Sequence, residues 1–204
     1  SEEYVANAKQ KRQEGQGMGQ LIRPIPLQYE RLKAGSSITI GDEQWHIMIG
    51  RGHSPEHVCL FNANKEILIS GDHVLPIISP NIGVYSTEPN ANPLEQYLST
   101  LPQFKDLPEN TLVLPSHKQA FIGLHTRVNE LIEHHHIHLA NLREFCQTGR
   151  TIKDCLPILF KRKLNPHNMF FAIAEAFAHL NYLYFSGELS RDVNAQGQFI
   201  FKRL

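Results

Sequence analysis

A histidine and an aspartate in this chain lie where short apolar segments end, and both side chains can bind metal ions. His53 lies in the run Gly-His-Ser-Pro between the apolar segments 45–49 and 58–61, which predicts a turn between two strands. Asp72 follows the apolar run 67–69 and the dipeptide Ser-Gly, so its carboxylate is expected at the end of a strand. Imidazole and carboxylate groups at neighbouring strand ends predict a metal site.

His117 is a third candidate, and it follows the apolar segment 111–114 in the run Leu-Pro-Ser-His. Zinc takes three or four nitrogen, sulfur or oxygen ligands, and a paired site needs a carboxylate that bridges two ions about 3.5 to 4 Å apart. His53, Asp72 and His117 are of the right chemical types for such a site.

The three runs Gly-His-Ser-Pro, Ser-Gly-Asp and Leu-Pro-Ser-His resemble, in order and context, the motifs of the metallo-β-lactamase superfamily hydrolases. The C-terminal third resembles the bacterial branch that carries an appended winged-helix domain. The resemblance implies that His53 binds one metal ion, that Asp72 bridges two ions and is the catalytic residue, and that His117 binds the second ion. It also implies a di-zinc hydrolase in which a metal-bound hydroxide attacks an ester, a thioester or a related small-molecule substrate.

The chain departs from the family pattern at its start. Members of the family carry an earlier His-x-His-x-Asp-His segment that supplies most of the ligands, whereas residues 1–52 contain a single histidine, His46. We therefore expect the chain to be a C-terminal portion of a longer enzyme. Because the remaining ligands hold only part of each coordination shell, we expect zinc to be absent or weakly bound and this chain alone to be inactive.

Two other functions stay open. One is a single-stranded RNA endonuclease of the same fold, and the other is a non-enzymatic binding or assembly module. Twenty basic and twenty acidic residues leave no net charge, and the basic residues of the C-terminal region are spread along the sequence. Nucleic acid is therefore possible but not favoured as a partner.

The composition is that of a soluble globular chain, with 41% apolar residues and no run of about 18 apolar residues that would cross a membrane. The three cysteines form no Cys-x-x-Cys pair, so neither a disulfide framework nor a thiolate zinc site is indicated, and a cytoplasmic location is expected. We also expect self-association through exposed sheet surface.

The N-terminal part is predicted to contain strands around the candidate ligands. Apolar patterning and turn residues predict strands at 37–40, 44–49, 58–61, 66–70 and 111–114. Four prolines predict an irregular loop near the site over 76–93, followed by a helix that Asn92 or Pro93 begins. Before these strands, a short helix over 2–14 and a flexible linker at Gly15, Gly17 and Gly19 are expected.

Beyond Gly123 the apolar period changes to about 3.6 and predicts helices that end near Gly149, Phe160 and Gly187, followed by a hairpin over 188–201. The fold class is therefore α/β: the second half of a metallo-β-lactamase αββα sandwich followed by a small α+β winged-helix domain. The predicted domains are residues 1–123 and 124–204.

Other histidines have less specific interpretations. His57 and His73 either orient a ligand or are packed at a strand end, and packing is favoured. His134, His135, His136 and His138 are interpreted as a solvated helix face with His135 on the buried stripe, although His134 and His138, one turn apart, can chelate a metal adventitiously.

Overall fold

The computed structural model describes residues 28–161 and 163–204. The chain divides into two compact units, Ser1–Arg31 and Leu32–Leu204, and every helix and strand given below lies in the second unit. The helix expected over 2–14 and the glycine linker lie outside the described residues.

A five-stranded sheet carries the candidate ligands. Its strands are β1 (Ser37–Ile40), β2 (Glu43–Gly50), β3 (His57–Asn62), β4 (Ile67–Gly71) and β5 (Leu112–Pro115), in the spatial order β1-β2-β3-β4-β5. Strands β1 to β4 pair antiparallel, whereas β5 pairs parallel to β4. The carboxyl ends of β4 and β5 and the turn between β2 and β3 therefore meet at one edge of the sheet.

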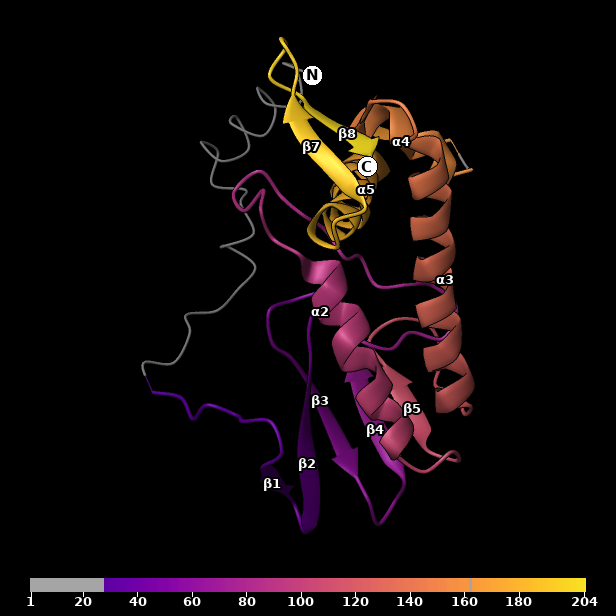
Figure 1. Ribbon diagram of the computed structural model, residues 1–204. Helices are drawn as coiled ribbons and strands as arrows, with labels where there is room; N and C mark the ends of the chain where they lie inside the picture. The colour runs from indigo at the N-terminus through magenta and orange to yellow at the C-terminus, as the bar shows by residue number, and fades with distance from the viewer. Residues whose placement is uncertain (1–27, 162) are drawn as a thin grey trace. The chain divides into compact units, whose positions relative to one another are not determined.

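One face of this sheet is buried beneath helices. Cys59, Phe61, Leu68 and Val113 alternate with outward-facing residues and join a single apolar cluster with side chains of the helices. These helices are α2 (Pro93–Thr100), the 3-10 helix η2 (Leu101–Asp106) and α3 (Leu124–Phe145). Figure 1 shows α2 and α3 alongside the strands.

The opposite face is apolar and only partly exposed, since Ile47 on this side is buried. Val58 is 37% exposed and Ile69 is 38% exposed, and the register places them on neighbouring strands on the same side of the sheet. Leu60, which pairs with Ile69, is half-buried on that side. A patch of this kind favours contact with another apolar surface.

The C-terminal region contains the predicted helices and hairpin. Its elements are α3, β6 (Arg150–Thr151), α4 (Ile152–Leu159), α5 (Pro166–Phe185), β7 (Leu189–Val193) and β8 (Phe199–Arg203). Thr151 and Asp154 form a capping box at the start of α4, and Asn165 caps α5 ahead of Pro166. The three short strands form a second sheet in the order β6-β8-β7.

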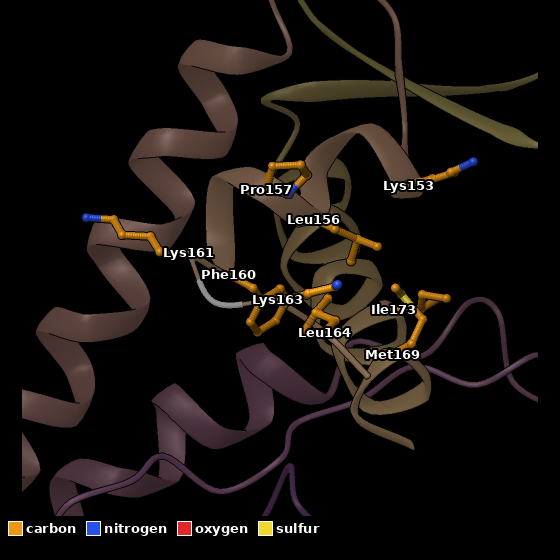
Figure 2. A pocket seen from close by; sticks show the side chains of 9 residues that line it. All are labelled: Lys153, Leu156, Pro157, Phe160, Lys161, Lys163, Leu164, Met169 and Ile173. Carbon is orange, nitrogen blue, oxygen red and sulfur yellow. The ribbon is translucent and has the colours of Figure 1, made fainter. Parts of the chain in front are cut away.

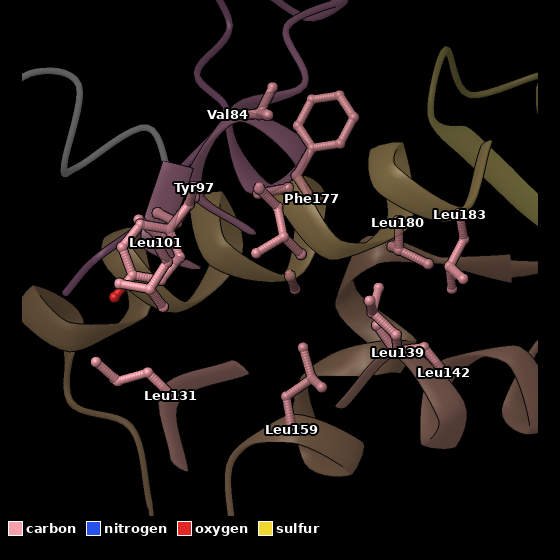
Figure 3. Close-up of a cluster of buried hydrophobic side chains, with 14 of the residues drawn as sticks. Val84, Tyr97, Leu101, Leu131, Leu139, Leu142, Leu159, Phe177, Leu180 and Leu183 are labelled. Carbon is pink, nitrogen blue, oxygen red and sulfur yellow. The ribbon is translucent and has the colours of Figure 1, made fainter. Parts of the chain in front are cut away.

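The apolar core continues across the predicted domain boundary at Gly123. Figure 3 shows Leu139 and Leu142 of α3 near Leu180 and Leu183 of α5, in the same cluster as Tyr97 of α2. The mixed α/β fold class is confirmed, whereas the domain boundary and the winged-helix assignment stay predictions.

The irregular segment between Pro76 and Asn92 is held by the C-terminal region. The buried Asn181 of α5 donates hydrogen bonds to the carbonyl oxygens of Pro89 and Ala91, at 3.0 and 2.9 Å. Arg191 of β7 donates to Asn181 Oδ1 and to the carbonyl of Pro89. These bonds tie residues 89–91 to α5 and β7.

Within the described residues, no helix is both long enough and apolar enough to span a membrane.

Candidate metal centre

The structure brings His53, Asp72 and His117 together at the predicted edge of the sheet. Asp72 directly follows β4, His53 lies in the turn between β2 and β3, and His117 follows β5. The Nε2 atom of His53 lies 3.5 Å from Asp72 Oδ2, and the Nε2 atom of His117 lies 3.3 Å from Asp72 Oδ1. One carboxylate thus lies between two imidazoles, with a different oxygen facing each.

The orientation of His53 is fixed from the far side of its ring. Its Nδ1 atom lies 2.9 Å from the carbonyl oxygen of Asn81, in the irregular segment 76–92. A carbonyl oxygen only accepts hydrogen bonds, so Nδ1 carries a proton and the neutral ring has its lone pair on Nε2. That lone pair faces a carboxylate oxygen, an arrangement that a proton or a cation between the two atoms stabilises.

Asp72 is oriented by His57 and Ser116. The backbone N–H of Asp72 donates to His57 Nε2 at 2.9 Å, and Ser116 Oγ donates to Asp72 Oδ1. The backbone N–H of Ser116 donates to the carbonyl of Gly71 at 3.0 Å, which holds the ends of β4 and β5 side by side. Burial and the neighbouring His53 lower the pKa of His57, so its ring is neutral near pH 7 and Nε2 can accept. His57 therefore contacts the backbone of Asp72, and a role in positioning this candidate ligand stays a prediction, the less favoured of the two sequence interpretations.

Two glycines make room for the histidines behind the centre. Gly71 has φ +52°, and a Cβ built on it would lie 2.4 Å from His57 Nε2. A Cβ on Gly50 would lie 2.3 Å from the ring of His73. Both distances are shorter than any ordinary contact, so a larger residue at either position must displace an imidazole.

His73 packs behind the centre, as predicted. It is fully buried, and its ring lies 5.0 Å from that of Phe104 and 5.1 Å from that of Tyr97. The Tyr97 hydroxyl donates to the carbonyl of His73 at 3.0 Å. Burial lowers the pKa of His73 to about 3, so this side chain is uncharged near pH 7 and contributes packing rather than charge.

The donor set fits a metal ion of the zinc class. Two imidazole nitrogens and a carboxylate that offers one oxygen to each are ligand types that zinc accepts, and the side chains of His53 and Asp72 are about one-third exposed, at 31% and 28%. The hydrogen bonds from Asn81, His57 and Ser116 orient the ligands in the way that outer-shell partners do in metal centres.

The histidines of α3 do not form the solvated face that the sequence predicted. His135 is buried, in agreement with the prediction, but His134 and His138 are half-buried as well. The ring of His138 lies 5.5 Å from that of His179, because α5 packs along this side of α3. Of the four, only His136 is exposed.

A separate hollow lies in the C-terminal region. It has a volume of about 650 Å³ and is lined by apolar side chains of α4, α5 and the segment between them, with three lysines among the lining residues. Figure 2 shows Leu156, Leu164 and Ile173 around it. None of its lining residues belongs to the candidate centre at Asp72.

Comparison with known proteins identifies the family and agrees with the mixed α/β fold. A family model described as "Metallo-beta-lactamase superfamily" matches residues 3–117, and one described as "Metallo-beta-lactamase-like, C-terminal domain" matches residues 139–204. The crystal structure of a beta-lactamase domain protein from Burkholderia ambifaria is 42% identical and superimposes with a TM-score of 0.86 over 89% of this chain and 54% of that one.

Two more distant relatives are also similar to this chain. The crystal structure of a metallo-beta-lactamase family protein from Thermus thermophilus is 25% identical, with a TM-score of 0.75 over 88% of this chain and 56% of that one. An uncharacterized protein of Aquifex aeolicus is 28% identical over 94 residues, which are 46% of this chain and 43% of that protein. The chain thus spans about half the length of these relatives. The superfamily model covers residues 3–117, which is more than half of the 204-residue chain, and the chain therefore belongs to the metallo-beta-lactamase superfamily.

Proposed function

We propose that this chain is part of a metal-dependent hydrolase and that His53, Asp72 and His117 are ligands of its metal centre. The observation that supports this most directly is the carboxylate of Asp72, which faces His53 through Oδ2 and His117 through Oδ1. A carboxylate placed in this way can serve two ions at once, and two zinc ions fit the ligand types. The substrates proposed are esters, thioesters or related small molecules.

A divalent ion bound at this centre would supply Lewis-acid activation of water and stabilisation of the negative charge that develops on a carbonyl oxygen. The protein's own contribution is to hold the ligands in place before the ion arrives. Asn81 keeps the proton of His53 on Nδ1, which leaves Nε2 free to bind. His57 and Ser116 fix the aspartate from its backbone and side chain, respectively.

The C-terminal region supports the same centre through the segment 76–92. Asn81 lies in this segment, and the segment is bonded to α5 at two further points: Val84 N–H donates to the carbonyl of Ala174, and Asn181 holds residues 89–91. We propose that α5 thereby sets the position of Asn81 and, through it, the orientation of His53.

The test is metal content and hydrolysis of a chromogenic thioester, with labelled single-stranded RNA as a second substrate. Both are measured on this chain and on the chain preceded by a family segment that supplies the His-x-His-x-Asp-His ligands. We expect activity only in the second protein. There Asp72→Ala should be more damaging than His53→Ala or His117→Ala, because one carboxylate serves both ions.

Asp42→Ala is the matched control, since Asp42 is exposed in the turn between β1 and β2. It should keep both metal and rate. Unchanged metal content and rate in the Asp72→Ala protein would refute the proposal. Cleavage of RNA but not of the thioester would show that the substrate is RNA rather than an ester or thioester.

A further inference from the structure

A second group of metal-binding side chains lies between α3 and α5, apart from the centre at Asp72. His134 and His138 are one turn apart on α3, so their side chains lie on the same face of the helix, and their ring centroids are 4.1 Å apart. Glu175 of α5 faces them. One ligand atom from each of these three residues lies within 4.8 Å of the other two, and all three residues are half-buried.

The two histidines each bury a ring nitrogen that has no hydrogen-bond partner within the described residues. These atoms are Nε2 of His134 and Nδ1 of His138. Burial lowers the pKa of both rings, for His138 to about 4, so both are neutral near pH 7. A neutral imidazole with a buried nitrogen and no partner leaves a polar atom unsatisfied, and a bound cation would satisfy it.

His135, next to His134 on α3, also has a buried ring nitrogen without a hydrogen-bond partner in the described chain, and its contact with His179 shows which nitrogen this is. His179 Nδ1 lies 2.8 Å from the carbonyl oxygen of Glu175, so it donates there, and the neutral His179 ring has its lone pair on Nε2. His135 Nδ1, 3.0 Å from that Nε2, must then be the donor between the two rings. This leaves the lone pair of His135 on Nε2, an atom that is also buried and without a partner in the described chain.

The ligand types select the class of ion. Two imidazoles and one carboxylate suit Zn²⁺, Co²⁺ or Ni²⁺, whereas Ca²⁺ and Mg²⁺ need more oxygen ligands than this group offers. Zinc bonds of about 2.0 to 2.1 Å place tetrahedral ligand atoms about 3.4 Å apart, so atoms that lie within 4.8 Å of one another close by at most about 1.4 Å on binding.

One neighbouring charge opposes a cation here. Arg127 lies on the same helix and its charge acts on His134. Its guanidinium is held by Glu130 at 2.8 Å and by the carbonyl oxygens of Leu75 and Ile78. Of these partners, the Glu130 carboxylate carries a negative charge that opposes the charge of Arg127.

We propose that His134, His138 and Glu175 form a second metal site that binds one divalent ion of the zinc class and links α3 to α5. Three protein ligands leave a fourth position for water or another small ligand. Because the ligands come from both helices, binding stabilises the packing of α5, and with it the contacts that hold residues 84–91.

The experiment uses the full 204-residue chain without a histidine tag, in a background that removes the first centre: His53→Ala, Asp72→Ala and His117→Ala together. After chelator treatment, this background protein is titrated with Zn²⁺ by equilibrium dialysis and with Co²⁺ by visible absorption. We expect one Zn²⁺ per chain, the d–d spectrum of four-coordinate Co²⁺, and a Tm rise of roughly 5–10 °C at a Zn²⁺ concentration 100-fold above Kd.

In that background, His134→Gln with His138→Gln should weaken Zn²⁺ binding by at least about 100-fold, and Glu175→Gln alone should weaken it less. His136→Gln, on the exposed side of the same helix, is the control and should bind as the background protein does. Circular dichroism checks that each variant is folded, and the single Glu175→Gln variant tests the site if the double variant is not. The proposal is overturned if the background protein binds no Zn²⁺, or if its ion survives the loss of both histidines.

Discussion

Replacing Gly71 with alanine tests how tightly the centre at Asp72 is built. The new methyl group would lie 2.4 Å from His57 Nε2, the atom that accepts the hydrogen bond from the Asp72 N–H. Three costs follow: about 1 kcal/mol for an alanine at φ +52°, about 1 kcal/mol for the lost hydrogen bond, and about 1–3 kcal/mol for the displaced ring. We expect unfolding to become easier by about 3–5 kcal/mol.

Gly41 is a matched control because it separates the backbone cost from the packing cost. It has φ +62°, but a Cβ built on it meets no atom within 4 Å. Gly41→Ala should therefore cost only the backbone term of about 1 kcal/mol. The difference between the two variants, about 2–4 kcal/mol, measures the displaced ring of His57 together with its lost hydrogen bond.

The assay is urea unfolding followed by circular dichroism, with the double variant Gly71→Ala and His57→Ala as a further test. Because the shorter side chain makes room for the methyl group, we expect the cost of Gly71→Ala in the His57→Ala background to fall to the value of the Gly41 control. Equal losses for Gly71→Ala and Gly41→Ala in the natural background would refute this account of the site.

Three further predictions follow from other parts of the molecule. Asn181→Leu removes the bonds to Pro89 and Ala91 at similar volume, so faster amide exchange at Ala91 is expected by mass spectrometry, and unchanged exchange would contradict it. Burial lowers the pKa of His135 to about 2 and of His179 to about 3, below the unfolded value near 6.5. In acid the unfolded chain therefore binds more protons than the folded chain. The free energy of unfolding should fall below pH 6.5 by about 1.4 kcal/mol per pH unit for each of these two histidines, until the pH reaches their folded pKa values. Urea midpoints that stay constant from pH 7.5 to pH 5.5 would contradict this. Light scattering should find concentration-dependent self-association that the double change Val58→Lys with Ile69→Lys abolishes. A monomer at every concentration would count against the sheet face that carries Val58 and Ile69 as an interface.

The sequence predicted the strands and most helices because their signals are local. The Gly-Asp turn before β2 and the start of α2 at Pro93 depend only on neighbouring residues, and the structure has both. The expected cap from Asn92 is not made, because its side chain forms no hydrogen bond with the first turn of α2. The two-residue strand β6 was missed because it is too short to show a period.

His53, Asp72 and His117 were grouped from the sequence, and the structure brings them together, but the residues that orient them were not predicted. The meeting of Asp72 with His117 depends on the parallel pairing of β4 with β5, which joins segments about 45 residues apart and which was not predicted from the sequence. Only the shared role of the two residues was inferred, from family resemblance. The bond from Asp72 to His57 depends on how the start of β3 lies beside the end of β4, and no sequence spacing indicates it.

The histidines of α3 show the same limit more clearly. Their spacing places His134 and His138 on one face, but whether that face meets solvent or another helix depends on how α5 packs against it. Glu175 and His179 lie about 40 residues further along the chain. The prediction of a solvated face was therefore wrong, because α5 packs against this side of α3.

The most direct measurement of the central proposal is the anomalous diffraction of zinc in a crystal of the chain joined to the His-x-His-x-Asp-His segment. We predict two anomalous peaks flanking Asp72, each about 2.0–2.2 Å from one of its carboxylate oxygens, with His53 Nε2 beside one peak and His117 Nε2 beside the other. A zinc-saturated crystal with no anomalous peak at Asp72 would contradict the assignment of these three residues as the metal centre.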